Sequence, residues 1–469
     1  MPTSNDATVK GHVLHHWDPE NPEFWEKTGA RIAKRNLWIS IISLTISFSI
    51  WVLWSVVTVN LDKVGFRFTS NQLFWLTAVP ALSGATLRVF YSFMVPIFGG
   101  RRWTVISTLS LLLPAVGMGI ALQDNSTSYS TLLILAALCG LGGGNFSSSM
   151  ANISFFYPKA KKGTATGLNA GIGNLGVSLA QFVVPLVISS AMVGSFTGEG
   201  LHYVEKGVEK TLWLQNAGFV WVPFIVISVI LAWFGMNDIA DAKASFKDQA
   251  IIFRRKHNWL MCWLYVGTFG SFIGFSAGLA LLTKSQFPDV NPTQYAFLGP
   301  LVGALTRPVG GWISDRLKAG ATVTLYTFLL MVLGVVGVLF TLPSEGHAGN
   351  FPAFLGMFIL LFALSGIGNG STFRMIPVIF LTARTQEAEK TPEAQRQAVV
   401  QGNKEASAVL GFSGAVGAYG GFFIPKSFGT SLEATGSVDM ALYAFIAFYL
   451  SCMVVTWWFY ARKGARTPC

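Results

Sequence analysis

Apolar stretches long enough to cross a bilayer recur along the whole chain, separated by short polar segments. An α-helix needs about 20 residues to span the hydrocarbon core. Twelve stretches meet that length, six on each side of a charged segment. Their ranges are 37–59, 72–97, 103–122, 131–156, 163–192, 213–236, 259–283, 294–314, 321–342, 351–382, 403–428 and 438–461. The pattern predicts an all-α membrane protein with twelve transmembrane helices in two sets of six.

The polar segments set the predicted domain limits. We expect an N-terminal tail at 1–36, a first half at 37–236, a linker at 237–258, a second half at 259–461 and a C-terminal tail at 462–469. Because the N-terminal tail is polar, we expect it to be disordered. Its three histidines leave metal binding open as an alternative; they are His12, His15 and His16.

The two halves repeat one another in sequence. Leu82–Arg88 (L-S-G-A-T-L-R) aligns without a gap with Leu301–Arg307 (L-V-G-A-L-T-R), and Gly140–Gly144 matches Gly366–Gly370. Since each half has six spans, both repeats start on the same side of the membrane and are related by an axis along its normal. A site between two such repeats can be exposed to either side in turn.

Composition agrees with a membrane protein, because 52% of the residues are hydrophobic and only 12% are charged. The net charge is +11, and most basic residues lie in loops on the side of the N-terminus. The positive-inside rule therefore predicts that both termini are cytoplasmic. Because this rule accounts for the positive charge of the loops, the charge does not indicate nucleic-acid binding. The four cysteines show no metal or redox spacing, so we expect neither a metal nor a cofactor.

Two arginines lie deep inside apolar spans. Arg88 and Arg307 occupy the same position of the repeat, and no Asp or Glu lies at their depth. A guanidinium at the bilayer centre costs about 2.5–3.5 kcal/mol, so such residues normally face a cavity and serve a function. The pair predicts an anion site. Among the other basic residues we place only Arg374 within a span, near its cytoplasmic end, where we expect a salt bridge at an interface or gate.

Glycine is dense in the fifth and eleventh spans, at Gly167–Gly176 and Gly411–Gly420. Close helix packing is one explanation. The other is that bare backbone, beside the amides of Asn169 and Asn174, lines a polar cavity that grips a small anion. The sequence leaves both explanations open.

These residues resemble the nitrate/nitrite porter family of the major facilitator superfamily, and most of all its bacterial NarK-type members. The resemblance covers nearly the whole chain, and Ala165–Gly176 and Ala408–Gly420 match the family's two nitrate signatures. It implies the major facilitator fold, a place in the bacterial cytoplasmic membrane, nitrate and nitrite as substrates, the lipid bilayer as surroundings and function as a monomer. The signature glycines are Gly167, Gly171, Gly173, Gly176, Gly411, Gly417 and Gly420.

The resemblance also implies a binding site, in which Arg88 and Arg307 clamp the anion from opposite halves. Five further residues complete its shell: Phe146, Asn174, Tyr265, Phe269 and Ser413. The chemistry fits nitrate, because a planar guanidinium offers paired N–H donors to a planar oxyanion and aromatic faces can cover its π system.

A second motif resembles the superfamily's loop between helices eight and nine. It is Gly310–Arg316 (G-G-W-I-S-D-R), and the resemblance implies a gating role for Asp315 and Arg316. The equivalent segment after the second span keeps Gly99–Arg102 but has Pro96 where Asp315 would align. We therefore expect that half of the gating motif to be degenerate.

The coupling mode follows from missing residues. No Asp, Glu or His lies in the central part of any span, and Glu405 lies at a helix mouth. Because proton symport usually needs a titratable relay in the membrane, nitrate/nitrite exchange is the simpler interpretation. Two guanidinium groups about 7 Å apart repel by roughly 2 kcal/mol at an effective dielectric constant of 20, so a bound anion favours closure. Proton symport through Lys404, Tyr265 or a bound water is the alternative, followed by an anion channel; a membrane enzyme lacks a catalytic residue set.

Overall fold

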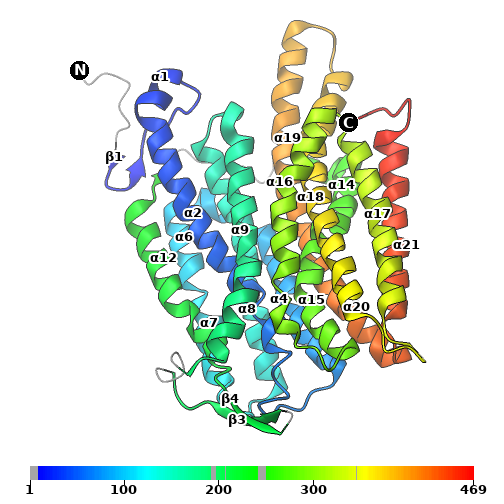
Figure 1. The fold of residues 1–469 in the computed structure, drawn as a ribbon. Coiled ribbons are helices and arrows are strands. Elements are labelled where there is room, and N and C mark those ends of the chain that lie inside the picture. The colour runs from blue at the N-terminus through cyan, green and yellow to red at the C-terminus, as the bar shows by residue number, and fades with distance from the viewer. Residues whose placement is uncertain (1–8, 192–196, 206, 241–249, 345) are drawn as a thin grey trace. The chain divides into compact units, whose positions relative to one another are not determined.

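The protein consists of two compact, mainly helical units. The structure is a computed structural model that describes residues 9–191, 197–205, 207–240, 250–344 and 346–469 (Figure 1). The first unit comprises Met1–Phe68 and Val79–Ala244, and the second comprises Thr69–Ala78 and Ser245–Cys469. Residues 241–249 of the predicted linker lie outside the described residues.

In the first unit, one long helical segment forms the start of the fold. It runs through α1 (Pro22–Phe24), the π-helical turn η1 (Trp25–Gly29), α2 (Ala30–Trp51) and α3 (Trp54–Val57). The other helices are α4 (Ser70–Tyr91), α5 (Met94–Phe98), α6 (Gly100–Leu109), α7 (Leu112–Ala121), α8 (Tyr129–Phe156), α9 (Lys159–Ile188), α11 (Asn216–Phe219) and α12 (Trp221–Gly235). A hairpin of β3 (Leu201–Glu205) and β4 (Val208–Leu212) lies at the opposite end of this unit from α1 (Figure 1).

In the second unit, helices again follow one another with short connections. They are η2 (Ala250–Arg254), α14 (Lys256–Tyr265), η3 (Val266–Gly270), α15 (Ser271–Gln286), η4 (Pro292–Gln294), α16 (Leu298–Leu317), α17 (Gly320–Thr341), α18 (Phe351–Glu387), α19 (Pro392–Ala418), α20 (Gly420–Thr435), α21 (Asp439–Thr456) and η5 (Trp457–Ala461). The first turns of α4, at 69–78, are part of this unit, where Phe74 and Trp75 contact the α20 rings of Phe428 and Phe422.

The prediction of a helical membrane protein is confirmed. Eleven helices among the described residues are long and apolar enough to cross a membrane. The remaining predicted span corresponds to α16, which has 20 residues and carries Arg307, Asp315 and Arg316. These charged residues, together with four glycines and two prolines, make α16 less apolar than its neighbours, although its length is similar to theirs.

The N-terminal tail is folded over its described part, so the prediction of disorder is wrong there. β2 (Val13–Leu14) pairs antiparallel with β1 (Val9–Lys10) and parallel with β5 (Asp238–Ile239), which follows α12. The Trp17 indole donates a hydrogen bond to the Phe155 carbonyl oxygen over 3.1 Å. The tail is polar on average, but its aromatic residues supply enough apolar surface to pack, which composition alone concealed.

The three tail histidines do not form part of a metal-type cluster in the described residues. No group of three or more His, Cys, Asp or Glu side chains lies close enough there to hold a metal ion. His15 and His16 are exposed, and the His16 ring packs edge-on against Phe24.

The glycine runs of α8 and α18 allow these helices to touch their neighbours through backbone. A Cβ on Gly142 would lie 2.1 Å from the Ser47 carbonyl oxygen of α2. In the second unit, a Cβ on Gly370 would lie 2.1 Å from the Arg307 carbonyl oxygen of α16. Close packing therefore explains these two runs in both units.

This packing generates a stability prediction. Replacing Gly142 with Ala should lower the melting temperature of the detergent-solubilised protein, because the added methyl meets a main-chain oxygen and overpacking costs about 1–3 kcal/mol. Gly163→Ala is the matched control, since a Cβ there has no described atom within 4 Å. Equal melting temperatures for the two variants, followed by intrinsic fluorescence, would contradict the packing argument.

Candidate functional site

Arg88 lies near the end of α4 in the first unit and is fully buried. Its Nε donates a hydrogen bond to the Gly143 carbonyl oxygen of α8 over 2.9 Å. Glycine at 143 has no side chain to block this approach. The main-chain oxygen therefore offsets part of the cost of burying the guanidinium.

Three aromatic rings surround the Arg88 guanidinium. Its central carbon lies 4.6 Å from the ring centre of Phe146, 5.0 Å from that of Trp51 and 5.9 Å from that of Phe48. Phe48 stacks on both Trp51 and Phe146. The negative ring faces stabilise the cation by about 0.5–2 kcal/mol each when water is excluded. The predicted residue Phe146 thus contacts Arg88, and Phe48 and Trp51 join it.

Glycine also makes room for this aromatic group. A Cβ on Gly84 of α4 would lie 2.7 Å from the Trp51 Nε1, and one on Gly143 would lie 2.6 Å from the Trp51 ring. The Trp51 indole donates to the Pro80 carbonyl oxygen over 2.7 Å. This bond joins the last residue of α2 to the main chain of α4.

Arg307 lies on α16 in the second unit, with an exposed fraction of 7%. Its Nη2 lies 3.5 Å from the Tyr265 hydroxyl oxygen, at the limit of a hydrogen bond, and its guanidinium faces the Phe373 ring at 5.4 Å. Its Nη1 is buried and has no hydrogen-bond partner among the described residues. A buried, unpaired guanidinium N–H is costly, so an anion that accepts from it would be bound strongly.

The aromatic residues beside Arg307 are placed by a π-helical turn. Tyr265 ends α14, and Phe269 lies in the π-helical η3, which follows directly. Their ring centres are 5.6 Å apart, and both side chains are buried. The turn carries one extra residue per turn, so it shifts the side chains after Tyr265 away from the regular helical positions. Tyr265 therefore lies between the Arg307 guanidinium and the Phe269 ring, and the role of all three in binding an anion stays a prediction.

Asn174 and Ser413 are buried on α9 and α19. The Asn174 Oδ1 has no hydrogen-bond partner among the described residues, and rotation of the amide would present its N–H₂ instead. The Ser413 hydroxyl donates to the Val409 carbonyl oxygen of its own helix. Asn174 is thus an available polar group, whereas Ser413 must first turn its hydroxyl to donate to a ligand. Their contact with an anion stays a prediction.

Part of each glycine signature serves packing. Gly173 and Gly176 of α9 face Leu44 and the Thr45 carbonyl oxygen of α2. The equivalent glycines in the second unit do the same, with Gly417 against Tyr265 and Gly420 against Gly270.

Three other signature glycines are different. A Cβ on Gly167 or Gly171 of α9, or on Gly411 of α19, would meet no described atom within 4 Å. Packing cannot explain glycine at these three positions. They keep open the second explanation, in which bare backbone faces a cavity.

The loop motif of the second unit forms an ion pair. The Asp315 carboxylate lies 2.6 Å from the Arg374 Nε of α18, which confirms the expectation of a salt bridge for Arg374. The Arg316 guanidinium faces the Trp312 ring at 5.3 Å. The gating role of Asp315 and Arg316 stays a prediction.

One basic residue inside a helix was missed. Lys426 lies in α20, although we expected Arg374 to be the only span residue besides the arginine pair. The predicted span 403–428 contains Lys426, but its charge was overlooked there, and α20 continues to Thr435. The Lys426 ammonium donates to Asn71 over 2.7 Å, and it faces the Trp75 ring at 4.9 Å.

Glu405 is also deeper in its helix than expected. α19 begins at Pro392, so Glu405 lies more than three turns inside, with an exposed fraction of 5%. Its carboxylate accepts hydrogen bonds from Arg384 and, over 3.3 Å, from Arg255. Both partners occupy its oxygens, so it does not resemble an open proton carrier in this arrangement.

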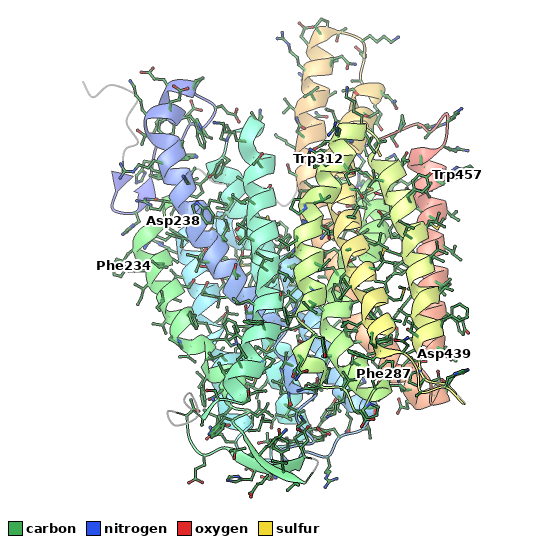
Figure 2. All side chains as sticks on the ribbon, viewed as in Figure 1. Phe234, Asp238, Phe287, Trp312, Asp439 and Trp457 are labelled. Carbon is green, nitrogen blue, oxygen red and sulfur yellow. The ribbon has the colours of Figure 1, made fainter. Side chains whose placement is uncertain are left out.

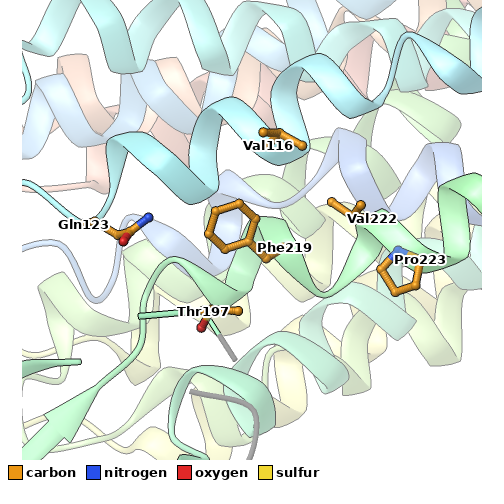
Figure 3. Close-up of a pocket in the computed structure, with 6 residues that line it drawn as sticks. All are labelled: Val116, Gln123, Thr197, Phe219, Val222 and Pro223. Atoms are coloured by element: carbon orange, nitrogen blue, oxygen red, sulfur yellow. The ribbon is translucent and has the colours of Figure 1, made fainter. Parts of the chain in front are cut away.

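A pocket in the first unit lies away from the arginine. It has a volume of about 470 Å³ and is lined by Val116, Gln123, Thr197, Phe219, Val222 and Pro223 (Figure 3). No charged side chain is among these residues, so the pocket does not suit an anion.

Comparison with known proteins gives consistent matches. The sequence matches the family described as Major Facilitator Superfamily over residues 39–425. It is 51% identical over 452 residues to the "Nitrate/nitrite transporter NarU" of Escherichia coli (strain K12), covering 96% of this chain and 97% of that protein. It is 42% identical over 470 residues to the "Probable nitrate/nitrite antiporter NarK2" of Thermus thermophilus, covering 98% and 99%. The crystal structure of a D-xylose-proton symporter has a similar fold, with a TM-score of 0.64, 13% identity, and coverage of 91% of this chain and 97% of that one.

Proposed function

Because the chain belongs to the nitrate/nitrite transporters of the major facilitator superfamily, we propose that it exchanges nitrate for nitrite across the bacterial cytoplasmic membrane by alternating access. Its relatives and its fold are those of transporters and not of enzymes. Arg88 and Arg307 hold the anion, one from each half. Both termini lie in the cytoplasm.

The observation that carries the proposal is that Arg307 is buried with a hydrogen-bond donor left over. Its Nη1 is buried without a partner in the described residues, next to the Tyr265 hydroxyl and the Phe373 ring. Nitrate and nitrite are planar oxyanions that accept hydrogen bonds in the plane of a guanidinium, and an aromatic face can lie against them. In the first unit, Arg88 and the rings around it likewise provide a guanidinium and aromatic faces.

Two features of the charged residues favour exchange over proton symport. Arginine keeps its proton at any physiological pH, so the pair cannot be discharged by losing one. The buried Glu405 is held by Arg384 and Arg255. A second anion is therefore the simplest way to neutralise the site during the return step.

The first functional prediction concerns the paired N–H donors of the Arg88 and Arg307 guanidinium groups. Arg88→Lys and Arg307→Lys should each reduce transport to near background while the protein still inserts, because lysine keeps the charge but loses the paired planar donors. Uptake of labelled nitrate into proteoliposomes measures this. Arg67→Lys, at an exposed loop position, is the matched control and should transport normally. Wild-type rates in either site variant would refute the assigned role.

The second prediction separates the gate from the site. Asp315→Asn should slow exchange several-fold yet leave nitrate affinity of the solubilised protein nearly unchanged, because Asp315 pairs with Arg374 and not with the anion. Binding is measured by isothermal titration calorimetry and exchange in proteoliposomes. A large loss of affinity at an unchanged rate would place Asp315 in the binding site instead.

The third prediction tests the coupling mode. Proteoliposomes loaded with nitrite should take up external nitrate quickly, and empty ones should take up little, because only an internal anion allows the loaded return step. An imposed pH gradient should not replace internal nitrite. Accumulation of nitrate in empty vesicles after external acidification alone would show proton symport, and uptake that neither saturates nor shows counterflow would show a channel.

A further inference from the structure

The first unit has a buried carboxylate, Asp238, next to its loop segment Gly99–Arg102, although Asp238 is not part of that segment in sequence. Asp238 follows α12 and has an exposed fraction of 6%, and Figure 2 labels it beside that helix. Its Oδ1 accepts hydrogen bonds from the main-chain N–H groups of Arg101 over 2.8 Å and of Arg102 over 3.4 Å. Its Oδ2 lies 3.4 Å from the Arg101 Nε. Asp238 thus binds the start of α6, next to the position where Pro96 replaces an aspartate.

The glycines kept in this loop make room for the carboxylate. Gly99 has a φ of +88°, a conformation that other residues rarely adopt. A Cβ there would lie 2.4 Å from the Asp238 Oδ1. The retained Gly99–Arg102 segment is therefore fitted to a carboxylate that comes from more than 130 residues away.

Arg101 completes a link between α6 and α12. It is 6% exposed, its Nη1 donates to the Trp233 carbonyl oxygen over 3.0 Å, and its guanidinium faces the Trp233 ring at 4.6 Å. Two buried charges of opposite sign thus join the start of one helix to the end of another. Removing one of them would leave the other buried without its counterion.

The N-terminal strands hold Asp238 from behind. Its main-chain N–H donates to the His12 carbonyl oxygen, and the N–H of Ala240 donates to that of Leu14, both over 3.0 Å. The preceding Asn237 is bound in turn by the side chains of Arg35 and Asn36. The position of Asp238 is therefore fixed by the tail as well as by the loop.

The second unit has a related arrangement built from other residues. There the loop carboxylate Asp315 pairs with Arg374 of α18. The N–H of Ala321, at the start of α17, donates to the Cys469 carbonyl oxygen over 2.9 Å. In the first unit, an oxygen of Asp238, which follows α12, accepts a hydrogen bond at the start of α6. In the second unit, an oxygen of Cys469, which follows η5, accepts one at the start of α17. The helices α6 and α17 each begin the third span of their repeat.

We propose that Asp238 is the gating carboxylate of the first unit, a positioning residue that performs there the part proposed for Asp315 in the second unit. The N-terminal strand pair holds it in place. The gating motif of the first half is thus not degenerate, because its carboxylate comes from the segment after α12. This inference rests on the proposed transport function.

The test compares Asp238→Asn with wild type in proteoliposomes that contain nitrite. Exchange per nitrate-binding site should fall about tenfold or more while the dissociation constant of nitrate changes by less than about twofold, since the residue acts on turnover and not on the anion. A merely structural role would reduce the number of binding sites and not the rate at each site. Asp238→Glu, which keeps the charge, should restore most of the rate.

The matched control is Asp124→Asn, which removes one carboxylate from an exposed loop of the same unit. Hydrogen bonds from Ser126 lower the pKa of the Asp124 carboxyl, so this substitution also removes a full charge at neutral pH. It should exchange at the wild-type rate. If Asp238→Asn does not fold, Arg101→Gln removes the ionic partner while Asp238 still caps α6, and it should show the same loss of turnover.

Wild-type exchange by Asp238→Asn, or a loss of affinity that matches its loss of rate, would overturn the inference. So would a failure of Asp238→Glu to exchange better than Asp238→Asn. The wild-type vesicles report on the proposed function separately, because that proposal fails only if they show no nitrite-dependent nitrate uptake.

Discussion

A buried guanidinium in each unit is the constraint to which the surrounding helices are adapted. In the first unit, the cost is offset by the Gly143 carbonyl oxygen and by three aromatic rings. These contacts need a glycine run, because side chains at Gly84 or Gly143 would occupy the space of Trp51. The glycines of α8 are thus as much a part of the arginine's environment as the rings themselves.

The second unit meets the same constraint with different groups. Arg307 has a tyrosine hydroxyl and one aromatic ring nearby, and its buried Nη1 has no partner in the described part of the chain. The two equivalent arginines therefore differ in the groups that surround the guanidinium, although each is buried beside aromatic rings.

Most of the fold and the core of the site could be predicted from sequence, because their signals are local. An apolar run marks a helix wherever it packs, and an arginine inside such a run is conspicuous. Phe48 and Trp51 carried no such signal, since the chain has 38 Phe and 15 Trp and most of them pack in cores or face lipid. Lys426 did carry the signal and was overlooked, although the predicted span 403–428 includes it.

Contacts between distant segments were beyond sequence reasoning. The folded N-terminal tail depends on β2 meeting β5, more than 220 residues later, and Asp238 meets Arg101 across 137 residues. Nothing within a window of neighbouring residues indicates either pairing. Alignment of the repeats misled in the same way, because it looked for an aspartate at position 96 and could not see one supplied from elsewhere.

The acceptors at the starts of α6 and α17 have a consequence for how the two halves diverged. One is a side-chain oxygen of Asp238 and the other is a main-chain oxygen of Cys469, so no substitution matrix would align them. Selection after a duplication can preserve the location of a hydrogen-bond acceptor while the group that provides it is exchanged. The ancestral symmetry of such a protein is then better recorded in its three-dimensional contacts than in its residue identities, and repeat detection by sequence underestimates it.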